Sequence, residues 1–315
     1  MDRAAASEAA RALIGNVGRV IRGKDEAIGA AVTALLAGGH LLVEDVPGVG
    51  KTVLGRSIAR SISGSFKRVQ ATPDLLPSDI TGTSIYNQDT RSFEFIPGPV
   101  FANVVLIDEI NRTTPRTQSA LLEAMDEAAV TVDGQRHALP EPQFIIATQN
   151  PIEHHGTYPL PEGQLDRFAI AMDIGYTTAE TEAQLIRAQL QAHPIEDLDP
   201  VLSPEEISEI RHLVRETHVD DDVLGYALAI VRATREHPDV EVGGSTRASI
   251  MLVRCTQARA LIDGRDFVIP DDVKALAVSV LAHRLLSSPS SYLDERRGQT
   301  IVEQVVSSTP VPVRG

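Results

Sequence analysis

The spacing of apolar residues changes character along the chain. Between residues 41 and 148, short apolar runs alternate with longer stretches in which apolar residues recur every three or four positions. The short runs predict buried strands, and the longer stretches predict amphipathic helices packed against them. Since strands that alternate with helices form parallel sheets covered on both faces, an α/β fold is predicted. Its strands are expected at residues 41–44, 66–71, 104–107 and 144–148.

Two segments alternate with a period of two instead. Residues 83–95 carry turn residues from Asn87 to Thr90, and residues 130–139 carry Asp133-Gly134 near their centre. Alternation on both sides of a turn is typical of a β-hairpin. We therefore predict two hairpins inserted into the α/β core.

Helical spacing dominates at both ends of the chain. Residues 10–38 are predicted to form a helix that ends at Gly38-Gly39, and Thr114-Pro115 is predicted to begin another. Past about Gly175 the pattern is helical throughout, with a capping box at Ser203. Further helices are expected at residues 223–235, 245–262 and 271–286, followed by a frayed end from Ser307.

These patterns predict two domains. The first is an α/β core over residues 1–190, which includes the N-terminal helix and both hairpins. The second is a small all-α domain over residues 191–315. A chain of 315 residues is long enough for two such domains and for a large core.

The net charge and the cysteine content limit the classes of function that the chain can have. The net charge is −14. An acidic surface disfavours a sequence-independent grip on nucleic acid, which depends on Lys and Arg side chains that neutralise phosphates. Cys255 is the only cysteine, so an intramolecular disulfide is excluded and a reducing compartment is indicated.

No stretch of the sequence is typical of a membrane span or a signal peptide. The most apolar stretch, residues 28–43, is too short for a bilayer and is interrupted by Gly38, Gly39 and His40. Residues 1–8 lack the basic-then-apolar order of a signal peptide. We expect a cytoplasmic protein.

The segment from Val46 to Thr52 carries the most specific chemistry. A strand, a Gly-rich turn, Lys-Thr and a helix follow one another, which is the layout of a phosphate-binding loop. Backbone N–H groups of such a loop and the positive end of the following helix face one anion. Lys51 would reach the β- and γ-phosphates, and Thr52 would ligate Mg²⁺. The predicted nucleotide contacts here are Pro47, Gly48, Val49, Gly50, Lys51, Thr52 and Val53.

One position departs from the phosphate-loop pattern. The pattern has glycine where this chain has Asp45. That first glycine mainly relieves strain where the loop leaves the strand. The phosphate-facing residues Gly48, Gly50 and Lys51 are all present, so the prediction stands.

Two carboxylates end the apolar run at residues 104–107. Asp108 and Glu109 would lie at the carboxyl end of a buried strand, where open α/β sheets bind their ligands. Asp108 would hold Mg²⁺ through water, and Glu109 would activate the attacking water as general base. The alternative is a strand that ends in two solvated acids, which the Lys51-Thr52 loop makes much less attractive.

Further polar residues complete the predicted site. Asn150 follows the next strand and would orient the water or touch the γ-phosphate, although Asn150-Pro151 is also compatible with a simple turn. Arg167 is a candidate arginine finger that completes a neighbouring subunit's site, with a salt bridge to Asp166 or elsewhere as the alternative. Arg112 and Arg116 are rivals for that role.

Arg247 lies in the first turn of a predicted helix, after Ser245 or Thr246 as its cap. A cation there opposes the helix dipole, which indicates a partner anion. The nucleotide γ-phosphate is the functional candidate, and a nearby carboxylate is the alternative.

In this order, the motifs at 46–52, 104–109, 150, 165–168 and 243–248 resemble those of AAA+ ATPases, specifically the MoxR family. The resemblance covers residues 15 to 305, and Asp45 is similar to variants within the family. It implies a five-stranded sheet of order 5-1-4-3-2, a helical lid and hairpins at the two places predicted above. It also implies that the stretch around Ile21 flanks the adenine of ATP.

The resemblance further implies function. It implies a ring oligomer, commonly a hexamer, that hydrolyses ATP with Mg²⁺ at subunit interfaces. It implies chaperone-like work on a protein client, with a von Willebrand factor A-domain partner, often in metal insertion or complex maturation. A nucleic-acid motor or loader of the helicase-related group is the alternative, and a nucleotide-binding switch is disfavoured because Glu109 is present.

Overall fold

A five-stranded parallel sheet lies at the centre of the molecule, with the strand order β2-β5-β8-β1-β9. The computed structural model describes residues 1–46, 48–150, 157–189, 194–287 and 297–312. Numbered by their order in the chain, the five strands of the sheet lie in the order 5-1-4-3-2, as the resemblance implied. The four strands expected from the apolar runs are confirmed. The sheet consists of β1 (Leu41–Glu44), β2 (Phe66–Gln70), β5 (Val104–Asp108), β8 (Phe144–Gln149) and β9 (Ile170–Met172).

Alternate residues of the strands face two separate hydrophobic clusters, because successive side chains of a strand point to opposite faces. Val104 and Leu106 of β5 belong to the cluster that includes α1 (Arg3–Gly18), α2 (Asp25–Leu36) and α3 (Lys51–Ser61). Val105 and Ile107 belong to the cluster that includes α4 (Pro77–Thr81) and α5 (Pro115–Glu127). Helices therefore cover both faces, as predicted.

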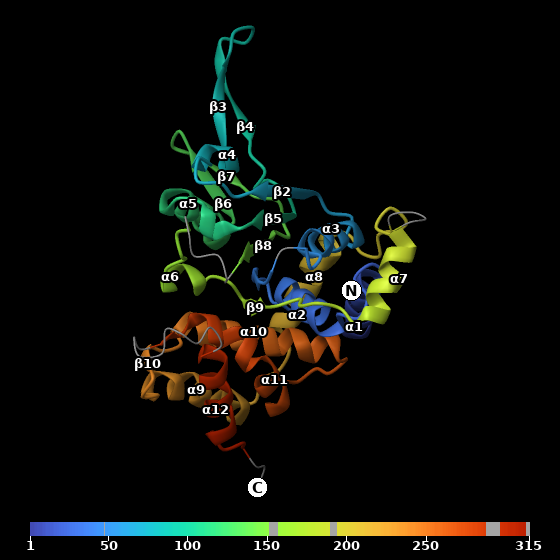
Figure 1. Cartoon of the computed structure of the whole chain (residues 1–315), viewed down its shortest axis with the longest axis vertical. Coiled ribbons are helices and arrows are strands. Elements are labelled where there is room, and N and C mark those ends of the chain that lie inside the picture. The colour runs from blue at the N-terminus through green and yellow to red at the C-terminus, as the bar shows by residue number, and fades with distance from the viewer. Residues whose placement is uncertain (47, 151–156, 190–193, 288–296, 313–315) are drawn as a thin grey trace.

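Both predicted hairpins are confirmed. β3 (Gly82–Asn87) pairs with β4 (Ser92–Pro97), and β6 (Ala129–Val132) pairs with β7 (Gln135–Ala138). Asp133 and Gly134 both have positive φ, 49° and 77°, which suits the tight turn between β6 and β7. The β3–β4 hairpin projects far from the body of the molecule (Figure 1).

The N-terminal helix differs from the prediction. Residues 10–38 do not form one helix, because the helical segment begins earlier, at Arg3, and is interrupted between Gly18 and Asp25. Gly23 in this interruption has a φ of 69°, which a helix cannot accommodate. Two helices, α1 and α2, result. The predicted helix at Thr114-Pro115 is confirmed, with Thr114 as the cap and Pro115 as the first residue of α5.

Shorter elements connect the parts of the core. A turn of 3₁₀-helix, η1 (Ile110–Arg112), follows β5, and α6 (Glu162–Leu165) precedes β9. The helix α7 (Ala179–Gln189) follows β9 and lies at one side of the molecule (Figure 1).

The C-terminal part is helical, as predicted, and Ser203 forms the predicted capping box. The helix expected to reach residue 286 ends at Leu281 and is followed by η2 (Ala282–Arg284) and by β11 (Leu286–Ser287), which pairs with β10 (Val240–Val242). The predicted frayed end is wrong up to Ser308, because a helix with buried Ile301, Val302 and Val305 continues there. The helices are α8 (Pro204–Arg215), α9 (Asp221–Glu236), α10 (Thr246–Ile262), α11 (Pro270–Leu281) and α12 (Arg297–Ser308).

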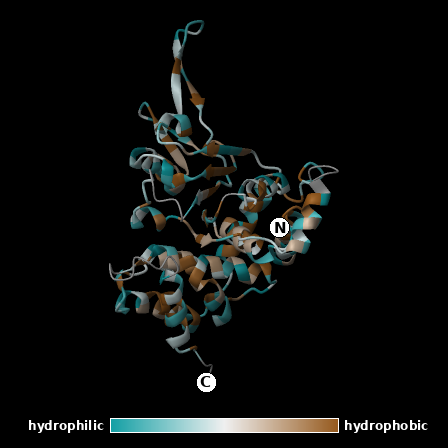
Figure 2. Cartoon of the chain, in the orientation of Figure 1, coloured by the Kyte–Doolittle hydropathy of each residue, from teal (hydrophilic) through white to brown (hydrophobic). Residues whose placement is uncertain are grey.

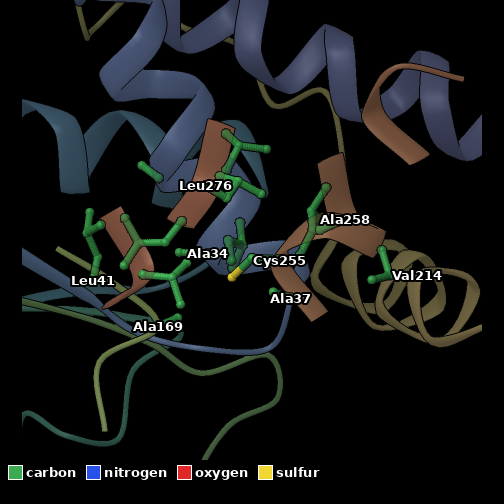
Figure 3. Close-up of a cluster of buried hydrophobic side chains, with 14 of the residues drawn as sticks. Ala34, Ala37, Leu41, Ala169, Val214, Cys255, Ala258 and Leu276 are labelled. Atoms are coloured by element: carbon green, nitrogen blue, oxygen red, sulfur yellow. The ribbon is translucent and has the colours of Figure 1, made fainter. Parts of the chain in front are cut away.

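One hydrophobic cluster joins the two parts of the chain. It contains Ala34 of α2 and Leu41 of β1 together with Cys255 of α10 and Leu276 of α11 (Figure 3). Cys255 is fully buried, and burial raises the pKa of its thiol to about 12. The helical part therefore packs directly on the N-terminal helices and the edge of the sheet. Within the described ranges, no helix is both long enough and apolar enough to cross a bilayer.

Candidate active site

The loop after β1 has the backbone that a phosphate-binding loop requires. Gly48 and Gly50 have φ values of 90° and 99°, which side chains rarely adopt. A Cβ at either glycine would meet nothing within 4 Å, so open space lies over the loop. The first turn of α3 contains no acidic residue, so its positive end is free to attract an anion. The loop therefore fits the phosphates of a nucleotide. Pro47, also predicted to contact the nucleotide, lies outside the described residues.

Lys51 connects the loop to the carboxylates of Asp108 and Glu109 at the end of β5. Its Nζ donates a hydrogen bond to the carbonyl of Asp45 at 2.5 Å. Burial lowers the pKa of the Lys51 ammonium, and the negative charges of Asp45, Asp108 and Glu109 oppose that shift. Thr52 follows in the first turn of α3 and is partly buried, as are Val49 and Val53. A cation, a hydroxyl and carboxylates thus lie at one edge of the sheet, a donor set that suits a nucleotide with Mg²⁺.

Asp108 and Glu109 are held by side chains from the neighbouring strand β2. Asp108 accepts a hydrogen bond from Nε of Arg68 at 2.6 Å. Glu109 accepts one from Nε2 of Gln70 at 2.9 Å and forms an ion pair with Arg112 at 3.2 Å. Glu109 also has a φ of 59°, a strained conformation for a residue with a side chain, of the kind that gathers at functional sites.

The end of β8 supplies the next polar residues. Thr148 Oγ1 donates to Asp108 at 3.2 Å and accepts from the backbone N–H of Glu109 at 2.9 Å. Asn150 follows β8 directly and is partly buried. Because β8 lies between β5 and β1, Asn150 emerges between the two carboxylates and Lys51. This is the location that a residue contacting the γ-phosphate or the water would need.

The turn between α1 and α2 lies close to the start of α3. Val20 forms a small buried cluster with Ile195 and Leu198, and Val53 packs against the same cluster. Ile21, which the resemblance implies to flank the adenine, is partly buried beside the main core. The predicted adenine and phosphate contacts are therefore neighbours.

Arg167 and Arg247 lie together, apart from Lys51. Both donate to the carboxylate of Asp126, at 2.5 Å from Arg167 Nε and 3.1 Å from Arg247 Nη1. Ser245 caps α10 and Arg247 lies in its first turn, as predicted. The sequence left open that each arginine pairs with a carboxylate of its own chain. Within this chain both arginines do so, and the carboxylate is that of Asp126. Of the two rivals, Arg112 pairs with Glu109 of its own chain, whereas Arg116 is exposed in the first turn of α5.

Asp126 lies near the amino end of β1, whereas Lys51 follows the carboxyl end of the same strand. Its neighbour Met125 has its carbonyl 3.3 Å from Nε2 of His40, the residue that precedes β1. The phosphate loop follows the other end of β1, about 13 Å away for a four-residue strand at about 3.3 Å per residue. The contact of Arg167 and Arg247 with Asp126 therefore lies about one strand length from the phosphate loop of the same chain.

Asp166 connects the segment before β9 to the helical part. Its carboxylate accepts from Nε of Arg284 at 2.9 Å and from Oγ of Ser245 at 2.8 Å. Arg284 is only 4% exposed and also donates to the carbonyls of Phe168, Ala169 and Val280. Arg284 therefore holds the Arg167 segment against η2 and the end of α11, while Ser245 holds the same segment at the start of α10, the helix that carries Arg247.

The sequence alone did not reveal several of these residues. Gln70 and Arg68 could have been suspected, because alternation along β2 places both on one face beside the Asp108 strand. Asp126 and Arg284 carried no local signal, since their partners lie far away in the chain. The missed residues at the site are Arg68, Gln70, Asp126, Thr148 and Arg284, and the contacts of Asp166 with Ser245 and Arg284 were also missed.

Comparison with known families agrees with this geometry. Residues 40–170 match the family described as "ATPase family associated with various cellular activities (AAA)", and residues 232–305 match the AAA lid domain. The first match covers the phosphate loop, both carboxylates and Arg167. The second contains Arg247 and Arg284.

Full-length relatives identify the branch. The chain is 49% identical to "Uncharacterized protein YeaC" of Bacillus subtilis, over 95% of this chain and 93% of that protein. It is 38% identical to "Chaperone MoxR1" of Mycobacterium tuberculosis, over 94% and 80%, and 31% identical to "Protein MoxR" of Methylorubrum extorquens, over 94% and 93%. A crystal structure of a candidate ATPase from Cytophaga hutchinsonii superposes with a TM-score of 0.91 at 34% identity, over 99% and 97% of the two chains. With the nucleotide site and the lid in place, the chain belongs to the MoxR family of AAA+ ATPases.

Proposed function

We propose that the chain hydrolyses ATP to ADP and phosphate with Mg²⁺, at sites that each need residues from two copies of the chain. The observation that carries this proposal is the separation of the polar residues into two groups, one at the carboxyl ends of the strands and the other near their amino ends. Lys51 and the two carboxylates follow the carboxyl ends of strands, whereas Arg167 and Arg247 gather around Asp126. Repeating the chain around a ring would bring one group against the other, and a hexamer is the form we expect.

Each residue then has a distinct role in the proposed reaction. Lys51 and the N–H groups of the loop bind the phosphates, and Glu109 takes the proton of the attacking water. Asn150 orients that water, and Arg167 and Arg247 of the adjacent copy stabilise the charge that develops during transfer. Mg²⁺, when bound, would neutralise charge on the phosphates, held by Thr52 directly and by Asp108 through water.

We propose a protein client for this motor, in keeping with the chaperone name of the Mycobacterium tuberculosis relative. The projecting β3–β4 hairpin supports a protein contact, because Phe93 is 74% exposed and packs edge to face against Tyr86. Hydrophobic residues are visible along this hairpin (Figure 2). At its base, Phe95 stacks on His137 of the second hairpin with ring centroids 3.9 Å apart, so the two inserts are mechanically connected. A von Willebrand factor A-domain partner and client maturation or metal insertion are the finer proposals, and we place the protein in the cytoplasm.

A nucleic-acid motor is the less favoured function. Such a motor would present basic residues on the β6–β7 hairpin. Arg136 of that hairpin donates to the carbonyl of Glu127 at 3.2 Å, and His137 stacks on Phe95. The net charge of −14 also opposes binding to phosphate backbones.

Phosphate release from ATP by the purified chain, with and without Mg²⁺, tests the proposal. The decisive arm mixes two variants that should each be inactive alone, Arg167→Ala and Lys51→Ala. If Arg167 acts on a neighbour's nucleotide, mixed rings will regain activity, because an Arg167→Ala subunit still offers an intact phosphate loop to the arginine of an adjacent Lys51→Ala subunit. A matched Arg232→Ala variant, changed at an exposed arginine of α9, should be as active as wild type. No recovery of activity in the mixture would contradict the two-copy site.

A further inference from the structure

The side chain of Asp45 is bound by three backbone N–H groups. Its Oδ1 accepts from Val46 at 2.7 Å, and its Oδ2 accepts from Ile174 at 2.8 Å and Gly175 at 2.7 Å. The residue is 8% exposed. A buried carboxylate surrounded by N–H donors is held firmly, since hydrogen bonds to charged groups are the strong ones.

The backbone N–H and carbonyl of Asp45 both form hydrogen bonds as well. Its N–H donates to the carbonyl of Gln149 at 3.2 Å, and its carbonyl accepts from Nζ of Lys51 at 2.5 Å. This one residue thus contacts the end of β8, the phosphate-binding lysine and the segment after β9. Asp45 has no positive φ, so glycine is not required at this position.

The segment that Asp45 binds also contacts the turn between α1 and α2, which lies close to the start of α3. Ile174 and Gly175 lie between β9 and α7, and Lys24 donates to the carbonyl of the next residue, Tyr176, at 2.7 Å. Lys24 belongs to the turn between α1 and α2, and Val20 of the same turn shares a cluster with Val53 of α3. Asp45 therefore connects the phosphate loop, by way of residues 174–176, to the turn that also packs against the start of α3.

We propose that Asp45 is a positioning residue for nucleotide binding, whose carboxylate holds the phosphate loop and the segment after β9 in one fixed arrangement. The proposal rests on the proposed nucleotide-binding function. A glycine at this position would restore the general phosphate-loop pattern, yet it would leave Val46, Ile174 and Gly175 without their acceptor. Nucleotide binding would then have to order these segments, which weakens affinity.

Equilibrium titration of the full-length protein with a fluorescent ADP analogue tests this proposal. We expect Asp45→Gly to weaken binding roughly tenfold or more, because three charge-assisted hydrogen bonds that pre-order the site are lost. Asp45→Asn should recover most of the affinity, since an amide oxygen can still accept from Ile174 and Gly175. Amide hydrogen exchange over residues 173–178 should be faster in Asp45→Gly than in wild type.

A second buried carboxylate separates positioning from general stability. Asp272 is 2% exposed, bound by Arg265 and far from the site in α11, so Asp272→Asn should lower the melting temperature and leave ADP affinity unchanged. If Asp45→Gly binds ADP as tightly as wild type, the positioning role is wrong. If Asp45→Gly and Asp45→Asn both bind ADP more tightly than wild type, the charge of Asp45 merely repels phosphate. If wild type itself fails to bind the analogue, the nucleotide-binding function fails instead.

Discussion

Arg167 and Arg247 donate hydrogen bonds to the same carboxylate, that of Asp126, from positions 80 residues apart in the chain. One negative charge between two cations leaves a net positive charge at this place. The side chains of Arg167 and Arg247 are 28% and 47% exposed, so both remain accessible from outside the chain. Asp126 therefore holds two accessible arginines side by side, an arrangement that suits the trans-acting role proposed for them.

Replacement of Asp126 should reduce turnover without weakening nucleotide binding to the same chain. We expect Asp126→Ala to lower the rate of ATP hydrolysis roughly tenfold, because a displacement of about 1 Å in a catalytic group costs up to about a hundredfold. Steady-state phosphate release and ADP titration would measure the two effects separately. The adjacent exposed Glu127→Ala is the matched control. An unchanged rate in Asp126→Ala would show that the shared contact has no role in turnover.

The phosphate loop and the proposed general base should separate binding from chemistry. Lys51→Ala should weaken ATP binding roughly a hundredfold or more, since a close charge partner of the phosphates is removed. Lys67→Ala, at an exposed lysine of β2, should bind normally. Retained ATP affinity in Lys51→Ala would contradict the assignment of the loop.

Glu109→Gln should have the opposite signature. ATP binding should persist while turnover falls by about 10² to 10⁴, the usual contribution of a general base. Single-turnover hydrolysis with the bound nucleotide measured in parallel gives both quantities. Glu123→Gln on the exposed face of α5 controls for the change of charge. Near wild-type hydrolysis by Glu109→Gln would remove this residue as the base.

Arg284 should be important for stability. Its loss leaves the partly buried Asp166 without its cation and leaves several buried carbonyls without a donor, which costs about 3–5 kcal/mol in the free energy of unfolding. Chemical denaturation of Arg284→Met and of the surface variant Arg232→Ala would compare a buried with an exposed arginine. A loss below about 1 kcal/mol in Arg284→Met would mean that water replaces the guanidinium at little cost.

Acid should destabilise the protein through His40. Burial lowers the pKa of His40 to about 4, while the unfolded chain has the ordinary value of 6.5. Its Nδ1 accepts from the N–H of Ile145, so protonation would break a buried hydrogen bond. The folded state therefore binds the proton less readily, and stability is full above pH 6.5 and falls between 6.5 and 4, by roughly 2 kcal/mol at pH 5.

The melting temperature of wild type measured from pH 7.5 to 5 checks this slope. His283 is also buried with a lowered pKa and adds a slope of the same sign. In His40→Asn the His40 contribution should disappear and the slope should be shallower, whereas exposed His212→Asn should keep the wild-type slope. Equal slopes in all three proteins would show that His40 titrates normally.

The sequence predicts those site residues that belong to motifs of consecutive residues. Lys51 with its glycines and Asp108 with its apolar run are each local patterns, and a parallel sheet brings their strand ends to one edge. The strand order itself came from the family resemblance and not from the pattern of apolar residues.

Residues whose roles depend on distant partners were not predictable in this way. Asp126 is one of several acids on α5 until Arg167 and Arg247 are placed beside it. Alternation along β2 places Gln70 on one face of its strand, but its partner becomes known only from the β2–β5 register, which pairs Gln70 with Asp108. The break between α1 and α2 was missed for another reason. Apolar residues keep their helical spacing on both sides of Gly18 and Gly23, so the pattern predicts one continuous helix.

The hydrophobic cluster shared by α2, β1, α10 and α11 determines how the chain can be divided. A cut near residue 190 would expose apolar surface on both fragments, including Leu41 and Leu276. Neither fragment would be expected to remain dispersed when expressed alone, and the two would reassemble if produced together. Bending of one chain at this boundary would disrupt the same cluster.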